Sequence, residues 1–262
     1  MEWLLNGKET PMKKLPKKEF TQKWQTYFKS AKLPLIFFYS NDIRYQEFLK
    51  PLPSKKRHVC LIGQLDICFK GKTIAFTKDT IGCGGGVRYS GFPYTFSPDF
   101  YYFLSCGVPG RLEGERYKKS PEIVKGAEKD MPKISAEGKF IVFKKWDLLE
   151  EEEEPVAVVF WDRPDVISGL FTLANFRTVS PQGVIAPFSS GCGSMIAYPV
   201  AENRRKSPRA VLGMFDISAR PYVDKNVLSL AVPIKKFIQM VEDMDESFLI
   251  TNSWKMVAKR IQ

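Results

Sequence analysis

Hydrophobic and polar positions alternate along the chain with two different periods. Residues 16–32 place Phe20, Trp24 and Phe28 at helical spacing with lysines between them, which predicts an amphipathic helix. The uninterrupted apolar run LPLIFFY at 33–39 then predicts a buried strand. The chain is therefore expected to lead from an N-terminal helical segment, about 1–32, into the first strand of a core.

The stretch HVCLIGQLDICFKG at 58–71 fits both periods. Leu61, Leu65 and Phe69 suit a strand face as well as a helical stripe, and Gly71, a typical helix stop, favours the helix. Cys60 and Cys68 share one face in a strand and lie about 80° apart around a helix. Cys68, beside Phe69, is expected to be a small core residue.

From residue 72 onward, the sequence predicts further strands and helices. Apolar runs at 72–76, 139–146, 156–161, 210–216 and 226–232 predict strands. Helices are predicted after Pro164, with a stripe of Val166, Leu170, Leu173 and Ala174, and at 189–205, 233–244 and 251–261. Pro233 is expected to be the first residue of its helix.

Two segments do not fit this pattern of strands and helices. Residues 91–132 are rich in aromatics and prolines without clean periodicity, which indicates an excursion that packs on the core and could lie over a site. The acidic run from Glu150 to Glu154 is interpreted as a solvated loop between two strands. With no fixed repeat and no linker, the pattern predicts one α+β domain over 1–262, with a mixed sheet and packed helices.

Composition supports a globular chain with a basic surface. Its 262 residues are 44% hydrophobic and carry a formal charge of +11. The cations are spread in short groups, which favours a solvated lysine-rich surface over a nucleic-acid site. Nucleic-acid binding is thus the least favoured function. The groups are Lys13, Lys14, Lys17 and Lys18; Lys55, Lys56 and Arg57; and Arg204, Arg205 and Lys206.

The apolar runs are shorter than the roughly 18 residues of a membrane helix, and no secretory signal pattern is visible. A cytoplasmic location without membrane contact is expected. The five dispersed cysteines, an odd number, indicate reduced thiols rather than disulfides. The oligomeric state has no signature in the sequence.

Familiar catalytic motifs are absent. The glycine run at 82–86 is followed by Val87 where a dinucleotide fingerprint needs glycine or alanine, and Asp66 occupies the first glycine position of a P-loop pattern. The single histidine, His58, follows three basic residues and is expected to be exposed. These features argue against standard nucleotide sites, His-rich metal centres and histidine-based hydrolases.

The remaining chemistry lies in cysteines set among glycines. Cys83 stands in IGCGGG and Cys192 in SSGCGSM. Backbone N–H groups in such loops can face anions, thiolates or cluster sulfides. The residues expected to form a ligand-binding cradle are Gly82, Gly84, Gly85, Gly86, Arg88, Ser189, Ser190 and Gly191.

Four of the thiols suffice for a metal centre if the fold brings them together. Cys60, Cys83, Cys106 and Cys192 are the candidate ligands of an iron–sulfur cluster or zinc, although no C-x-x-C pair supports them. If only one cysteine carries the chemistry, it is expected to be a reactive thiolate that Arg88 or a helix N-terminus activates.

Several runs resemble one protein family. HVCLIGQLDICFKGKTIAFTKDTIGCGGGVRYSG, RPDVISGLFTLANF, SSGCGSMIAYP and SARPYVDKNVLSLAVP are similar to domain-of-unknown-function family 169, from about residue 55 onward. The resemblance implies characteristic positions at Cys60, Cys83 and Cys192, with Arg220 and Pro233 in the C-terminal stretch. The excursion from Gly91 to Gly110 is longer than the family pattern, which leaves Cys106 without support from it.

Two kinds of function remain open. The first is a protein that holds a metal or iron–sulfur centre, or a reactive thiol, in a glycine-lined pocket. The alternative is a non-catalytic binding module in which the same loops cradle a small anionic molecule or cofactor.

Overall fold

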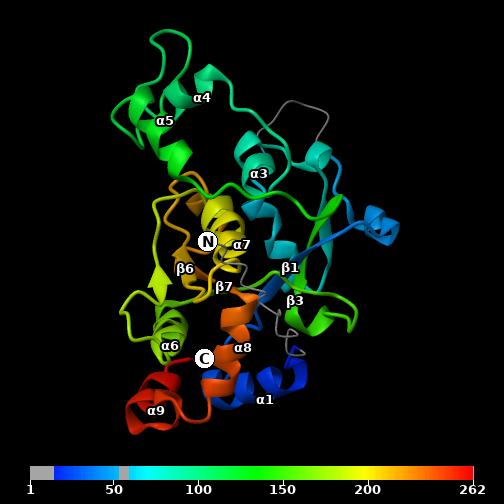
Figure 1. Ribbon diagram of the computed structural model, residues 1–262, viewed down its shortest axis with the longest axis vertical. Coiled ribbons are helices and arrows are strands. Elements are labelled where there is room, and N and C mark those ends of the chain that lie inside the picture. The colour runs from blue at the N-terminus through cyan, green and yellow to red at the C-terminus, as the bar shows by residue number, and fades with distance from the viewer. Residues whose placement is uncertain (1–14, 53–58, 262) are drawn as a thin grey trace, which may run out of the picture.

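The six predicted apolar runs and a two-residue strand that was not predicted, Val184–Ile185, assemble into one seven-stranded sheet. The computed structural model describes residues 15–52 and 59–261 (Figure 1). The strands are β1 (Leu35–Ser40), β2 (Ile74–Phe76), β3 (Phe140–Lys145), β4 (Ala157–Asp162), β5 (Val184–Ile185), β6 (Ala210–Gly213) and β7 (Leu228–Pro233). Their order is β2-β3-β1-β4-β7-β6-β5, and β5–β6 is the parallel pair among antiparallel ones. This confirms an α+β fold with a mixed sheet.

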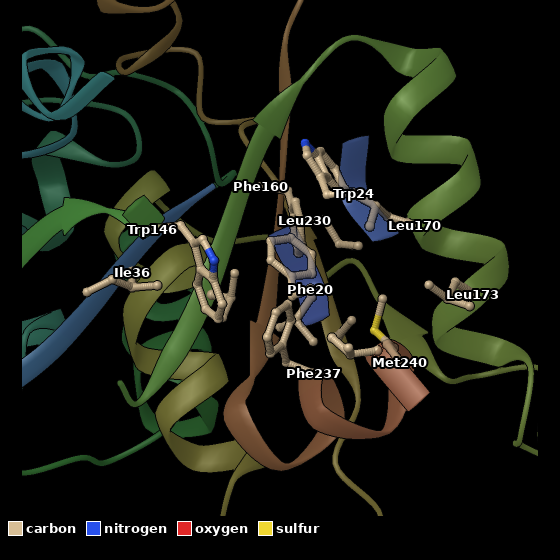
Figure 2. Packing of buried hydrophobic residues seen from close by; sticks show 14 of the residues in the cluster. Phe20, Trp24, Ile36, Trp146, Phe160, Leu170, Leu173, Leu230, Phe237 and Met240 are labelled. Carbon is tan, nitrogen blue, oxygen red and sulfur yellow. The ribbon is translucent and has the colours of Figure 1, made fainter. Parts of the chain in front are cut away.

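One face of the sheet packs against four helices. These are α1 (Lys17–Phe28), α6 (Pro164–Asn175), α8 (Ile234–Asp243) and α9 (Asn252–Ala258). Phe20 contacts Phe237 of α8 with ring centroids 4.9 Å apart, and Trp24 lies 5.2 Å from Phe160 of β4 (Figure 2). The predicted stripe on α6 is buried here, so this aromatic core anchors the side of the sheet away from the cysteines.

The opposite face carries shorter helical pieces. They are η2 (Ile62–Gln64), α2 (Asp66–Phe69), η3 (Lys78–Thr80), α3 (Gly84–Tyr89), the π-helical turn η5 (Gly193–Ala197) and α7 (Tyr198–Glu202). Two short helices therefore occupy 62–69, which agrees with the helical prediction for this stretch, and Gly71 follows them with a φ of +77°. Cys68 is fully buried in this second core, which confirms its structural role.

Residues 93–133, which we call the cap segment, extend beyond α3 at the top of Figure 1. None of them belongs to either hydrophobic core. The sequence showed no clean periodicity in this excursion and predicted no element in it, but it contains α4 (Pro98–Phe103) and α5 (Pro121–Asp130). Both helices begin with a Ser-Pro pair, and Ser120 accepts a hydrogen bond from the Ile123 N–H. These are ordinary start signals that the irregular composition concealed.

Two further expectations were wrong. The acidic run is not wholly solvated, because the Glu153 side chain is buried and lies 2.6 Å from Lys144 Nζ. Tyr45 also donates a hydrogen bond to Glu153 at 2.6 Å. Pro233 ends β7, and α8 begins one residue later. The remaining short helices are η1 (Ile43–Phe48), η4 (Trp146–Leu148), η6 (Arg220–Tyr222) and η7 (Phe248–Ile250).

No helix in the described part of the chain combines the length and apolar character needed to cross a membrane.

Candidate functional site

A cavity of about 1010 Å³ is lined by the cap segment and by the helical layer on the second face of the sheet. All seven predicted glycine and serine residues of the two loops line it. Its other walls are mostly apolar, with nine aromatic side chains: Tyr89, Tyr94, Phe96, Phe100, Phe103, Tyr117, Phe188, Tyr198 and Phe215. The volume is at the upper end for sites that enclose small organic ligands.

Three of the four predicted cysteine ligands line this one cavity: Cys60, Cys83 and Cys192. The backbone explains how they meet. A Cβ placed on Gly82 would lie 2.8 Å from Val59 Cβ, and one on Gly191 would lie 3.0 Å from Ile62 Cγ1. The segment 59–62 therefore packs against both glycine loops and brings Cys60 between them.

Cys83 begins a helix rather than sitting in an open loop, which corrects the sequence interpretation of 81–91. It is the N-cap of α3, and its Sγ accepts a hydrogen bond from the Gly86 N–H at 3.3 Å. The side chain is partly exposed. Its sulfur is thus held in place by the backbone while it remains accessible from the cavity.

The glycines next to Cys83 are explained largely by packing. A Cβ at Gly84 would overlap the Tyr94 hydroxyl, and one at Gly86 would lie 2.7 Å from Ile81 Cγ2 and 2.9 Å from Cys83 Sγ. Gly85 has only Tyr89 nearby, at 3.9 Å. Close contacts with protein side chains therefore explain why residues 84 and 86 are glycine, without the need for a ligand near them.

Cys192 is buried and directly precedes the π-helical turn. Pro199 follows this turn, and its missing N–H and bulky ring disturb regular helical hydrogen bonding. The preceding loop is held by the Asp216 carboxylate, which accepts a hydrogen bond from the Gly191 N–H at 3.1 Å. Such π-helical turns are rare and occur frequently at functional sites.

Burial governs the acidity of two of these thiols. It raises the pKa of Cys192 well above its usual value, and electrostatic repulsion from the neighbouring groups of Cys83, Cys60 and Asp216 raises it further. The pKa of Cys60 is also raised, first by burial and further by Cys83 and Asp216. Both thiols are therefore protonated at neutral pH.

Other predicted residues lie outside the cavity wall. Cys106 is exposed and does not line the cavity, and Arg88 pairs with Glu128 at 3.7 Å rather than facing the thiols. Among residues 15–52 and 59–261, no three His, Cys, Asp or Glu side chains are arranged to hold a metal ion. His58 lies outside the described residues.

The sequence interpretation did not identify Asp216 or the individual aromatic residues of the wall. It noted the aromatic density of residues 94–103 and considered that the excursion could lie over a site, but it named none of these residues as ligand-binding. Asp216 had no local signal, because its contact with Gly191 joins segments 25 residues apart.

Fold and cavity together define an α+β protein with a mixed sheet and a cavity that three cysteines line. The chain belongs to domain-of-unknown-function family 169 (DUF169, "Uncharacterised ArCR"), whose model matches residues 33–243, most of the chain. The match confirms the resemblance and includes the three cysteines of the cavity. Neither the curated proteins nor the solved structures gave a match.

Proposed function

We propose that this protein binds a small molecule with an aromatic or apolar body in the cavity and contacts it through the Cys83 thiol. One observation carries the proposal: three cysteines from distant parts of the chain and nine aromatic side chains surround the same cavity of about 1010 Å³. Aromatic surfaces supply most of the contact area in such sites, and a few polar groups fix orientation.

Cys83 is the thiol best placed to act on a ligand. Cys60 and Cys192 are protonated at neutral pH because burial raises the pKa of each. Cys83 is partly exposed, and the Gly86 N–H donates a hydrogen bond to its sulfur, which holds the sulfur at the cavity wall. In this proposal Cys83 provides the nucleophile, in a compartment that keeps thiols reduced, such as the cytoplasm.

Acrylodan, an uncharged naphthalene fluorophore with a Michael acceptor, tests the proposal. The thiolate sulfur forms a bond to the β-carbon of the acryloyl group, and the α-carbon takes a proton from solvent. We expect peptide mass analysis to find Cys83 modified, with blue-shifted emission from a probe in apolar surroundings. Label on Cys106, an exposed site outside the cavity, should emit as in water.

A matched pair of variants shows whether the cavity is needed. Gly85 lines the cavity and has open space beside it, so Gly85→Trp should reduce labelling of Cys83. Gly126 has open space on α5 away from the cavity lining, so Gly126→Trp should leave labelling unchanged. Labelling of Cys83 with a water-like emission, insensitive to Gly85→Trp, would refute the proposal.

A metal or iron–sulfur centre is the second candidate, since Cys60, Cys83 and Cys192 line one cavity. In the described residues these thiols are not arranged to hold a metal ion, so metal binding would require them to move closer together. If these three cysteines bound a metal, they would leave one coordination position for an exogenous ligand, as in catalytic metal sites. Anaerobic purification followed by an absorption spectrum and by iron, zinc and acid-labile sulfide analysis tests it. Stoichiometric metal that Cys83→Ser removes and Cys106→Ser retains would support this candidate over the organic ligand.

A further inference from the structure

We infer that the cavity selects an organic cation, such as a substituted amine with an aromatic or apolar body. The inference rests on the proposed function and adds the charge of the ligand. It departs from the anionic ligand expected from the glycine loops.

The charges on the described cavity wall are mainly negative. Four carboxylates line the cavity, at Asp99, Glu128, Asp130 and Asp216, against a single lysine, Lys118. Asp99 pairs with Arg111 at 2.7 Å and Glu128 with Arg88 at 3.7 Å, which neutralises two of them.

The two other carboxylates have no ion pair within the described residues. Asp216 is partly buried and accepts hydrogen bonds from the Ser218 backbone N–H at 3.0 Å and its hydroxyl at 2.8 Å. Its carboxylate also accepts a hydrogen bond from the Gly191 N–H at 3.1 Å, which places it next to the loop that carries Cys192. Asp130 is exposed on the cap side and contributes to the raised pKa of Tyr198.

The lysine is already engaged with an aromatic ring. Lys118 Nζ lies 4.5 Å from the centroid of Phe188, which is itself part of the cavity wall. This contact shows that the wall accepts a cation on an aromatic face. Aromatic faces together with uncompensated carboxylates are the groups that recognise ammonium ligands, and they repel anions.

The rim extends the apolar surface outward. Tyr94, Phe103, Phe188, Phe215 and Ile217 line the cavity and are all substantially exposed, Ile217 at 67%. A ligand with a large apolar body would cover these side chains while its charged group approaches Asp216. The wall therefore matches an amphipathic cation better than a small inorganic one.

Methanethiosulfonate reagents of equal length and opposite charge measure this selectivity at Cys83. The thiolate attacks the sulfenyl sulfur, the reagent's S–S bond breaks, and methanesulfinate leaves with the electron pair. We expect the ratio of rates for the trimethylammonium and sulfonate reagents to be about tenfold higher at Cys83 than at exposed Cys106. The comparison with Cys106 removes the general effect of the +11 net charge.

Two variants assign the selectivity to the named carboxylates. Asp216→Asn keeps an oxygen that can accept the Gly191 hydrogen bond, and Asp130→Asn changes an exposed residue. Each should lower the rate ratio at Cys83. Benzyltrimethylammonium should protect Cys83 from the uncharged methyl reagent, and benzenesulfonate at the same concentration should not.

The outcomes of these experiments distinguish failure of this inference from failure of the proposed function on which it rests. Ready reaction of Cys83 with the uncharged reagent, but no preference for the cation and no protection by benzyltrimethylammonium, would overturn the inference alone. Failure of Cys83 to react with any of the three reagents, in a folded protein whose Cys106 reacts, would overturn the proposed function as well.

Discussion

The three glycines after Cys83 differ in what surrounds them, although the sequence presents them as equivalent. Gly85 faces open space, so Gly85→Ala should leave the free energy of unfolding unchanged or raise it by up to about 1 kcal/mol, because alanine favours helix. Gly86→Ala should lower it by about 1–3 kcal/mol, since the new methyl would meet Ile81 and the Cys83 sulfur. Urea unfolding of the two variants measures both effects; equal stabilities would contradict the packing around Gly86.

The burial of Cys68 can be tested through the pH dependence of the free energy of unfolding. Its Sγ donates a hydrogen bond to the Phe143 carbonyl at 3.6 Å, and burial raises its pKa to about 12, with Asp66 adding to the shift. The folded state thus resists ionisation that the unfolded chain undergoes near pH 9. The resulting stabilisation is complete below that pH and is lost as pH rises towards 12.

We therefore expect the unfolding free energy of the wild type to fall faster above about pH 9 than that of Cys68→Ala. The difference in slope should approach about 1.4 kcal/mol per pH unit, the value for one proton. Denaturant unfolding from about pH 8 to about pH 10.5 covers the start of this range. Parallel curves for the two proteins would show that the thiol is not held protonated by the fold.

At the scale of elements, the cap segment is the least anchored part of the site. It contributes no residue to either hydrophobic core, and the Arg88–Glu128 ion pair connects α5 to α3. Native-state hydrogen exchange should show amides of α4 and α5 opening at least about 2 kcal/mol more easily than those of β4 and β7. Equal protection in the cap and the central strands would contradict this description.

The elements were predictable where one period dominated the sequence. The run at 156–161 and the stripe on α6 each had an unambiguous pattern, and both appear as predicted. The helix α3 was not predicted because its three glycines have low helix propensity. In the structure, the Cys83 cap and packing around the glycines fix the position of this helix. The π-helical turn has no sequence period of its own, so only a helix was predicted there.

At the scale of the whole molecule, the site depends on convergence of three distant segments. Sequence reasoning identified Cys60, Cys83 and Cys192 as a set and predicted the glycine loops that line the cavity. It included Cys106 because residue type alone does not distinguish an exposed thiol from one facing a cavity. It considered an anionic ligand because of the glycine loops, whereas the carboxylates of the described wall are brought together only by the fold.

Crosslinking with dibromobimane tests this convergence most directly, because the reagent becomes strongly fluorescent after both of its bromomethyl groups have alkylated thiols. Each step forms one C–S bond and releases bromide and the thiol proton. We predict a fluorescent adduct that joins Cys83 to Cys60 or Cys192 in peptide mass analysis, lost in Cys83→Ser and retained in Cys106→Ser. Only single alkylations in the folded protein, or adducts that depend on Cys106, would contradict a shared thiol site.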